Sequence, residues 1–288
     1  MRIATGLSTQ PDVLTPRRRP ANGNLPLAGK VLVTGATGGL GQAITRAFAA
    51  HGASLILTAR RESVLRQLAE EVAGRAVVCD LARREDVAAL ADVADRAAVD
   101  VLVANAALPG SGVITELSQE QIDLMLEVNL RAPVALARAL IPGMISRRRG
   151  HMVFISSLSG KAASPASSLY SATKFGLRGF ALGIREDLRP HGVGVSLVLP
   201  GFIRDAGMFA DADIVLPRGV GTRSPEDVAA AVIRAIERNR AEVEVAPLSL
   251  RLGASLAGVA PELAASVSRR MGSEKVSAEL AEGQRDKR

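Results

Sequence analysis

Short apolar runs alternate with longer amphipathic segments from Gly29 to about residue 245. Continuous apolar runs of this length are typical of strands that are buried on both faces. Their alternation with helical segments predicts right-handed crossovers and an α/β fold, a parallel, doubly wound sheet of about seven strands flanked by helices in a single domain. The predicted strands are Lys30–Thr34, Ser54–Thr58, Ala76–Cys79, Val99–Ala104, His151–Ser156, Val193–Leu199 and Ala241–Val245.

Helix start signals support several of the amphipathic segments. Ser224 and Pro225 offer a cap and a first-turn proline, which suit a helix N-terminus. Ser118 with Gln121 resembles a capping box. The predicted helices are Leu40–Ala50, Ser63–Val72, Arg84–Arg96, Gln119–Ser146, Tyr170–Arg189 and Ser224–Arg238.

The two ends of the chain differ from this pattern. Residues 1–26 are polar and rich in proline and arginine, which predicts a flexible tail before a main domain over residues 27–246. Residues 247–288 predict a helical C-terminal extension and a polar tail. Apolar residues in this extension recur at helical spacing, which favours a helix packed on the domain or in an oligomer contact, with a membrane-touching helix as the alternative. They are Leu252, Leu256, Val259 and Leu263.

Composition narrows the classes of function. Of the 288 residues 48% are apolar and only 2% aromatic, so aliphatic side chains must fill the core. The single cysteine, Cys79, excludes an intramolecular disulfide and, with three scattered histidines, argues against a metal site. It is consistent with a cytoplasmic location. The formal charge of +7 predicts solvated basic patches, or attraction to anionic ligands or a membrane surface. The shortage of aromatic residues argues against nucleic acid as a partner.

A glycine-rich segment, Thr34–Gly41, lies between the first predicted strand and the first predicted helix. Glycines let the backbone approach a ligand without a Cβ clash, and the helix N-terminus offers unpaired N–H groups to a diphosphate. Its place at the start of a βαβ pattern is typical of a dinucleotide site. The residues expected to hold the cofactor here are Gly35, Thr37, Gly39, Leu40 and Gly41.

Arg60 follows the second predicted strand, whose end lies beside the adenosine ribose in a doubly wound fold. An acidic residue there would bind the 2′-hydroxyl of NAD(H), whereas a guanidinium suits the 2′-phosphate of NADP(H). Arg60, followed by Arg61, therefore favours NADP(H) over NAD(H), unless both arginines are merely exposed at the strand end. Asp80, after the third strand, is placed either to accept from the adenine amino group or to cap the next helix.

Tyr170, the only tyrosine, and Lys174 lie one helical turn apart and share a helix face. The pKa of a free tyrosine is about 10, and a neighbouring cation lowers it. A simple surface pair is the alternative interpretation. Ser157 ends a buried strand, where ligands gather in open α/β sheets. Strand alternation sends the neighbouring Ser156 to the opposite face.

In combination these segments resemble the classical short-chain dehydrogenase/reductases, from about Leu27 to Val245. The resemblance implies a Rossmann-type fold and hydride transfer between NAD(P)(H) and an alcohol or carbonyl substrate. The motifs occur in family order: the turn Thr34–Gly41, Asn105–Ala107 after the fourth strand, Asn129 in the long helix, Ser157, the Tyr170 and Lys174 pair, and Pro200–Gly201 after the sixth strand.

The resemblance also implies a role for each residue. Tyr170 would be the general acid/base, Ser157 would orient the substrate oxygen, and Lys174 would lower the tyrosine pKa and hold the nicotinamide ribose. Asn129 would position a water in a proton relay to Lys174. The cofactor supplies the hydride, and the protein positions the reactants. Further cofactor contacts are implied at Asp80, Leu81, Asn105, Ala106, Tyr170, Lys174, Pro200, Gly201 and Ile203.

Three positions depart from the family pattern. Gly38 stands where a basic residue is frequent, which weakens the preference for NADP(H). Ala107 adds a methyl group where the backbone normally runs close to the cofactor. Asp205 replaces the usual cofactor-contacting threonine, so its carboxylate must point elsewhere or be neutralised by Arg204.

The leading hypothesis is an NADP(H)-preferring oxidoreductase, with a dinucleotide-binding sensor or scaffold as the alternative from another class. A membrane-peripheral reductase of lipid-like substrates is a further alternative. The segment Phe202–Gly221 should carry substrate specificity, and the family resemblance implies a homodimer or homotetramer. An apolar pocket wall is indicated by Met208, Phe209, Ile214, Val215 and Leu216.

Overall fold

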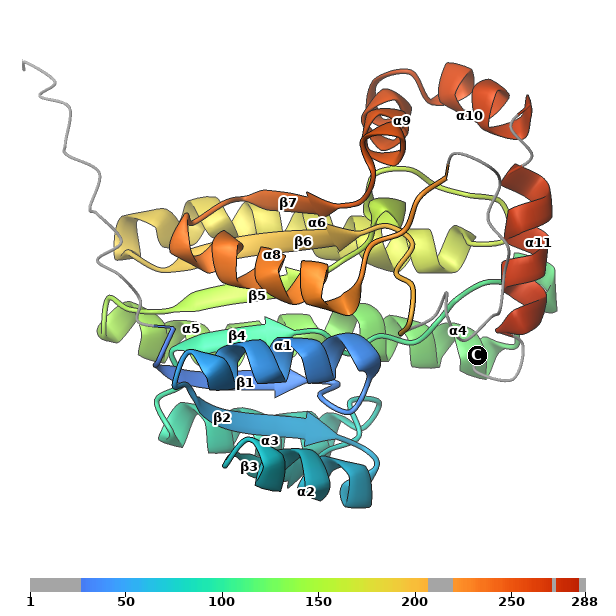
Figure 1. The fold of residues 1–288 in the computed structure, drawn as a ribbon. Coiled ribbons are helices and arrows are strands. Elements are labelled where there is room, and N and C mark those ends of the chain that lie inside the picture. Colours follow the sequence, from blue (N-terminus) through green and yellow to red (C-terminus); the bar gives the residue numbers. More distant parts are fainter. Residues whose placement is uncertain (1–26, 207–219, 271–272, 285–288) are drawn as a thin grey trace, which may run out of the picture.

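The fold is a single parallel sheet covered by helices on both faces (Figure 1). The computed structural model describes residues 27–206, 220–270 and 273–284; the expected N-terminal tail and the five apolar residues between 208 and 216 lie outside them. The strands run in the order β3-β2-β1-β4-β5-β6-β7, all parallel. The predicted doubly wound fold is therefore confirmed. The strands are β1 (Lys30–Thr34), β2 (Ser54–Ala59), β3 (Arg75–Val78), β4 (Val101–Ala104), β5 (His151–Ile155), β6 (Gly194–Pro200) and β7 (Glu242–Val245).

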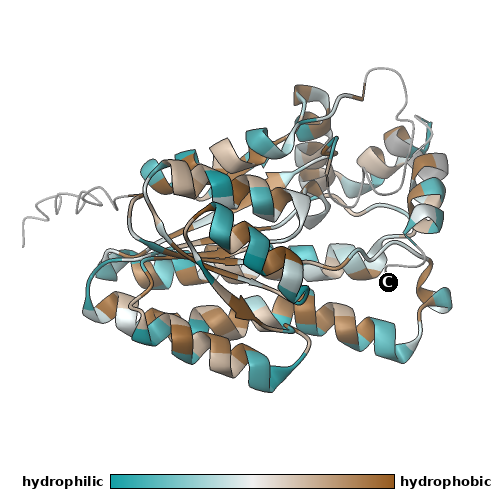
Figure 2. Ribbon diagram, turned by 60° about the horizontal axis from the view of Figure 1, so that its bottom comes forward, coloured by the Kyte–Doolittle hydropathy of each residue, from teal (hydrophilic) through white to brown (hydrophobic). Residues whose placement is uncertain are grey.

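Two hydrophobic layers hold the helices on the sheet. One face of the central strands packs with α1 (Gly39–Ala50), α2 (Glu62–Glu71) and α8 (Pro225–Glu237). The other face packs with α3 (Arg84–Arg96), α5 (Ala132–Ser146) and α6 (Ser168–Leu188). Figure 2 shows hydrophobic and hydrophilic residues alternating along these helices, as expected for elements with one buried face.

The long helix predicted over Gln119–Ser146 is interrupted in the structure. α4 (Gln119–Leu126) leads into a π-helical turn, η2 (Glu127–Arg131), and α5 follows. The hydrophobic period does not report a change of backbone hydrogen bonding within a helix, so the sequence pattern missed the turn. π-helical turns are frequent at functional sites, and this one carries Asn129. The predicted capping box at Ser118 and the predicted cap at Ser224 are both present, and Ser224 also forms a capping box, with Asp227.

The C-terminal extension forms three helices, α9 (Leu248–Val259), α10 (Pro261–Arg270) and α11 (Ser273–Gly283). In Figure 1 they lie beyond the carboxyl ends of the strands, where the arrowheads point. Of the expected positions for the apolar stripe, packing on the domain is not seen, because Leu252 is 62% exposed and Val259 87% exposed. The expected oligomer contact stays a prediction. The remaining short turns are η1 (Ile114–Glu116), η3 (Leu158–Gly160) and η4 (Arg189–His191).

The basic run Arg147–Arg149 contacts the chain at the amino end of β4, opposite the carboxyl ends of the strands. Arg147 donates to the Val99 carbonyl over 3.0 Å, and Arg149 pairs with Asp100 over 2.8 Å. This run is thus a set of structural contacts rather than a free anion-binding patch.

Candidate active site

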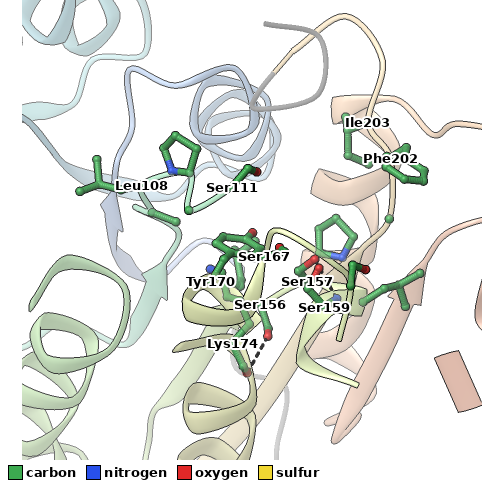
Figure 3. A pocket seen from close by; sticks show the side chains of 18 of the residues that line it. Leu108, Ser111, Ser156, Ser157, Ser159, Ser167, Tyr170, Lys174, Phe202 and Ile203 are labelled. Atoms are coloured by element: carbon green, nitrogen blue, oxygen red, sulfur yellow. Dashed lines mark hydrogen bonds between the residues drawn. The ribbon is translucent and has the colours of Figure 1, made fainter. Parts of the chain in front are cut away.

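A groove of about 2100 Å³ lies at the carboxyl ends of the strands and collects almost the whole predicted site. It extends from the β1–α1 turn to the loops after β5 and β6 and on to the C-terminal helices. Every site residue predicted from the sequence lines it except Asn129. Figure 3 shows Tyr170 and Lys174 on the same helix, near Ser157 on the loop after β5.

The β1–α1 turn fits a diphosphate because it brings backbone close together and leaves the helix N-terminus uncapped. A Cβ on Gly41 would lie 2.1 Å from the Gly35 carbonyl oxygen, so no larger residue fits without moving the turn. Gly38 is the N-cap of α1, and no side chain caps the helix N–H groups. Free N–H groups at a helix N-terminus are suited to an anion.

Asn105 and Ala106 support this turn from the end of β4. The Asn105 side chain donates to the carbonyls of Thr34 and Gly35 over 2.9 and 3.1 Å. The backbone N–H groups of Asn105 and Ala106 both donate to the Thr34 hydroxyl. Asn105 therefore holds the phosphate turn in place, while its backbone borders the groove.

Arg60 and Arg61 directly follow β2 and make different contacts. Arg61 donates to the Thr37 carbonyl over 3.2 Å, so it braces the phosphate turn. Arg60 is exposed and lines the groove. Asp80 accepts from the Ala82 N–H over 3.1 Å in a local turn; the N-cap of α3 is Arg83, so Asp80 does not cap that helix.

Ser157, Tyr170 and Lys174 form a compact polar cluster. Lys174 is 2% exposed; its Nζ donates to the Ile155 carbonyl over 3.1 Å and lies 5.5 Å from the centroid of the Tyr170 ring. The Ser157 hydroxyl accepts from the Ser159 N–H over 3.1 Å, which leaves its own proton for Tyr170 or a ligand. Ser156 is buried, donates to the Lys174 carbonyl and lines the groove together with Ser157. Its predicted orientation to the opposite face stays a prediction.

The protonation of the cluster differs from the sequence-based expectation. Burial raises the pKa of Tyr170 to about 12, and a hydrogen bond with Ser157 lowers it by less. Burial lowers the pKa of Lys174 to about 8. The pKa of Tyr170 is therefore raised rather than lowered as expected, because desolvation of the buried phenol is the largest influence on it. Tyr170 is a protonated phenol at neutral pH.

Asn129 lies in the π-helical turn, 1% exposed. Its amide oxygen accepts from the Leu108 N–H over 2.7 Å, and its nitrogen donates to the Leu108 carbonyl over 3.0 Å. These bonds fix the chain after β4. The expected proton relay from Asn129 to Lys174 stays a prediction.

The loop after β6 joins the groove through Pro200, Gly201 and Ile203. Ile203 is buried and bridges to Arg223, which ties the loop to the segment before α8. Asp205 has a left-handed backbone with φ 65° and lines the groove. The Arg204 guanidinium lies 3.2 Å from its carboxylate, so Arg204 offsets the negative charge near the cofactor loop.

Two parts of the groove were not predicted from the sequence. The segment Leu108–Ser111 borders it beside Tyr170, and the helices α9 to α11 supply a wall. The proline–glycine pair Pro109–Gly110 after the fourth strand could have indicated the segment Leu108–Ser111. The helical spacing of Val276 and Leu280 could have indicated the C-terminal wall.

Two features of other classes of protein are absent from the described residues. No described cluster of three or more His, Cys, Asp or Glu side chains is arranged to bind a metal ion. In the same part of the chain, no helix combines the length and the apolar character needed to cross a membrane.

Comparison with known proteins agrees with this geometry. A family model described as short chain dehydrogenase matches residues 29–213. Dehydrogenase/reductase SDR family member 7B of Xenopus tropicalis is 34% identical over 259 residues, which cover 81% of this chain and 82% of that protein. Ketoacyl reductase HetN of Nostoc sp. is 36% identical over 227 residues, or 76% of this chain and 79% of that protein.

A solved structure gives the same result. The short-chain dehydrogenase from Sphingobium yanoikuyae in complex with NADPH is similar with a TM-score of 0.72 and 29% identity, over 82% of this chain and 94% of that chain. The parallel sheet, the uncapped phosphate turn and the Ser157, Tyr170 and Lys174 cluster accord with these matches. This chain therefore belongs to the short-chain dehydrogenase/reductase family and is an NAD(P)-dependent oxidoreductase.

Proposed function

We propose that this enzyme reduces an apolar carbonyl compound to the alcohol with NADPH, using Tyr170 as the proton donor. The observation that carries the proposal is the meeting of Ser157, Tyr170 and Lys174 in the groove that continues from the phosphate turn. When bound, the reduced nicotinamide supplies the hydride to the carbonyl carbon. The carbonyl oxygen receives its proton from the chain.

Each of the three side chains has a separate task. Tyr170, a phenol at neutral pH, donates its proton to the carbonyl oxygen as the hydride arrives at carbon. The Ser157 hydroxyl donates a hydrogen bond that orients the same oxygen. Lys174, anchored on the Ile155 carbonyl, would hold the nicotinamide ribose with its ammonium group. Asn129 is a positioning residue, which acts through Leu108.

Substitution of Tyr170 tests this assignment. Tyr170→Phe should lower kcat for carbonyl reduction by roughly a hundredfold or more, because the ring stays while the proton donor is lost. NADPH binding, followed by cofactor fluorescence, should persist. Leu252→Ala, on the exposed face of α9, is a matched control for folding and handling. Unchanged turnover in Tyr170→Phe would reject the mechanism.

We also propose that the enzyme prefers NADP(H), with NAD(H) as the alternative. Arg60 supports the preference because its exposed guanidinium borders the groove at the end of β2. The relative from Sphingobium yanoikuyae was solved with NADPH. Arg60→Ala should reduce the ratio of NADPH to NADH affinity by roughly tenfold. If this ratio is unchanged in Arg60→Ala, Arg60 does not determine the cofactor preference.

The dinucleotide-binding sensor, the alternative from another class, is not favoured by the site. A sensor has no need of a proton donor between a serine and a buried lysine. The two hypotheses separate in one assay, since a sensor would bind NADPH but fail to oxidise it with any member of a carbonyl panel.

A membrane-peripheral reductase of lipid-like substrates is a second candidate, favoured by the exposed apolar residues of α9 and α10. Leu256 is both exposed and part of the groove lining, so this surface adjoins the site. A homo-oligomer would cover the same surface. Leu252→Glu should abolish co-sedimentation with anionic liposomes in the first case, and dissociate the oligomer on size exclusion in the second. The expected cytoplasmic location stays a prediction.

A further inference from the structure

The C-terminal helices give the groove an apolar wall. Its lining includes Leu250 and Ala254 from α9, Pro261 and Ala264 from α10, and Val276 and Leu280 from α11. Apolar side chains with few polar groups among them are typical of a pocket that binds by excluding water. The polar groups that orient a ligand, Ser157 and Tyr170, lie on the main domain instead.

An ionic network anchors the base of this wall next to the catalytic loop. Arg251 of α9 pairs with Glu244 of β7 over 2.9 Å. Lys161, which follows η3 and the Ser157 loop, pairs with the same Glu244 over 2.8 Å and with Glu242 over 2.7 Å. Glu244, whose side chain is 12% exposed, bridges Lys161 and Arg251, which links α9 to the loop.

A buried hydrogen bond anchors the far end of the wall. Ser111 donates to the Gln284 side-chain oxygen over 2.6 Å, and the two residues are 4% and 2% exposed. Ser111 directly follows Gly110 in the chain. A Cβ added to Gly110 would lie 2.9 Å from the Tyr170 Cβ. The last described residue of the chain is thus fixed to the segment that packs on the proposed proton donor.

We propose that α9 to α11 form a cap that selects the substrate by size, with Leu280 as a specificity-determining residue and the Ser111–Gln284 bond as the latch that keeps the cap closed. This inference rests on the proposed function. Its substrates are apolar ketones or the corresponding alcohols, whose hydrocarbon part lies against the cap while the oxygen faces Ser157 and Tyr170. The length of hydrocarbon accepted depends on the space beside Leu280.

Reciprocal substitutions of Leu280 test the selectivity. With straight-chain methyl ketones from butanone to decanone, Leu280→Ala should raise kcat/KM for the long ketones relative to the short ones by roughly tenfold. Leu280→Phe should shift the same ratio in the opposite direction. Leu252→Ala and Leu252→Phe, which change the exposed side of α9, should leave the ratio unchanged. Equal ratios in all five proteins would overturn the proposal.

Binding separates failure of the cap from failure of the chemistry. In Tyr170→Phe saturated with NADPH, displacement of an apolar fluorescent probe by the same ketones reports affinity without turnover. The Leu280 substitutions should alter the affinity order in this background too. If the Leu280 substitutions alter the affinity order while the enzymes that keep Tyr170 reduce none of the ketones, the cap stands and the proposed reaction fails. If the affinity order of the ketones is the same with and without the Leu280 substitutions, the cap fails.

Two substitutions test the latch. Gln284→Ala and Ser111→Ala should each raise KM by roughly threefold or more, with a smaller change in kcat and wild-type affinity for NADPH. Because the two residues share one bond, the double variant should be no worse than either single variant. Hydrogen exchange should show faster exchange in α11 of each variant. Additive effects on KM, or unchanged exchange in α11, would reject the latch.

Discussion

The Asn129 side chain uses both of its polar atoms on a single residue, Leu108, whose backbone N–H and carbonyl it bonds over 2.7 and 3.0 Å. The bonds join the π-helical turn to the segment that continues to Gly110, against Tyr170. One amide therefore sets the distance between the long helix and the wall of the site.

Removal of this amide should loosen that wall. Asn129→Ala leaves two part-buried backbone groups of Leu108 without their side-chain partner, so we expect a loss of about 1–3 kcal/mol of stability in denaturant unfolding, and a reduced kcat. Asn129→Asp keeps the acceptor and should lose less. Wild-type stability in Asn129→Ala would show that the bonds to Leu108 do not contribute.

The pH dependence should differ between the two directions of reaction. Tyr170, with its pKa raised to about 12 by burial, stays a proton donor at neutral pH. At saturating cofactor, kcat for reduction should be nearly constant from about pH 6 to 8, whereas kcat for alcohol oxidation should rise with pH as phenolate forms.

Ser157→Ala is the matched variant for this profile. The Ser157 hydrogen bond lowers the Tyr170 pKa, so its loss should move the oxidation profile further into the alkaline range. An oxidation rate that falls as pH rises from neutrality would contradict the assignment of Tyr170 as the base.

The phosphate turn offers a paired glycine test. Gly41→Ala would place a Cβ 2.1 Å from the Gly35 carbonyl oxygen, which should weaken NADPH binding by roughly tenfold or more. Gly38→Ala meets that oxygen at 3.5 Å, an ordinary contact, at an allowed φ of −75°. Titration calorimetry should show near-normal binding for Gly38→Ala; equal losses would place the constraint elsewhere.

Acid should unfold the protein partly through His151. The ring is buried with Nε2 2.8 Å from the Ser196 hydroxyl, and burial lowers its pKa from 6.5 to about 3. Between these values the unfolded chain binds a proton that the folded chain does not, so the free energy of unfolding should fall by a few kcal/mol as pH drops. His151→Asn should be less stable at neutral pH but show a smaller fall; an identical pH profile would exclude the histidine.

Local rules account for what could be predicted from the sequence. Buried parallel strands must be apolar on both faces, so the seven runs were visible, and capping residues such as Ser118 and Ser224 act within one turn of chain. The phosphate turn and the Tyr170–Lys174 pair are also local, because each lies within one short segment. These features therefore sufficed to predict the fold and a set of site residues of which all but Asn129 line the groove.

Tertiary structure decided the rest, since it depends on contacts between distant segments. The Tyr170 pKa follows from how much protein surrounds the phenol, not from Lys174 one turn away. The π-helical turn at Asn129 accompanies bonds to a residue 21 positions earlier. The position of the C-terminal helices depends on Ser111 and Gln284, which are 173 positions apart. Sequence periodicity identifies a helix, but only the folded chain determines which surface that helix covers.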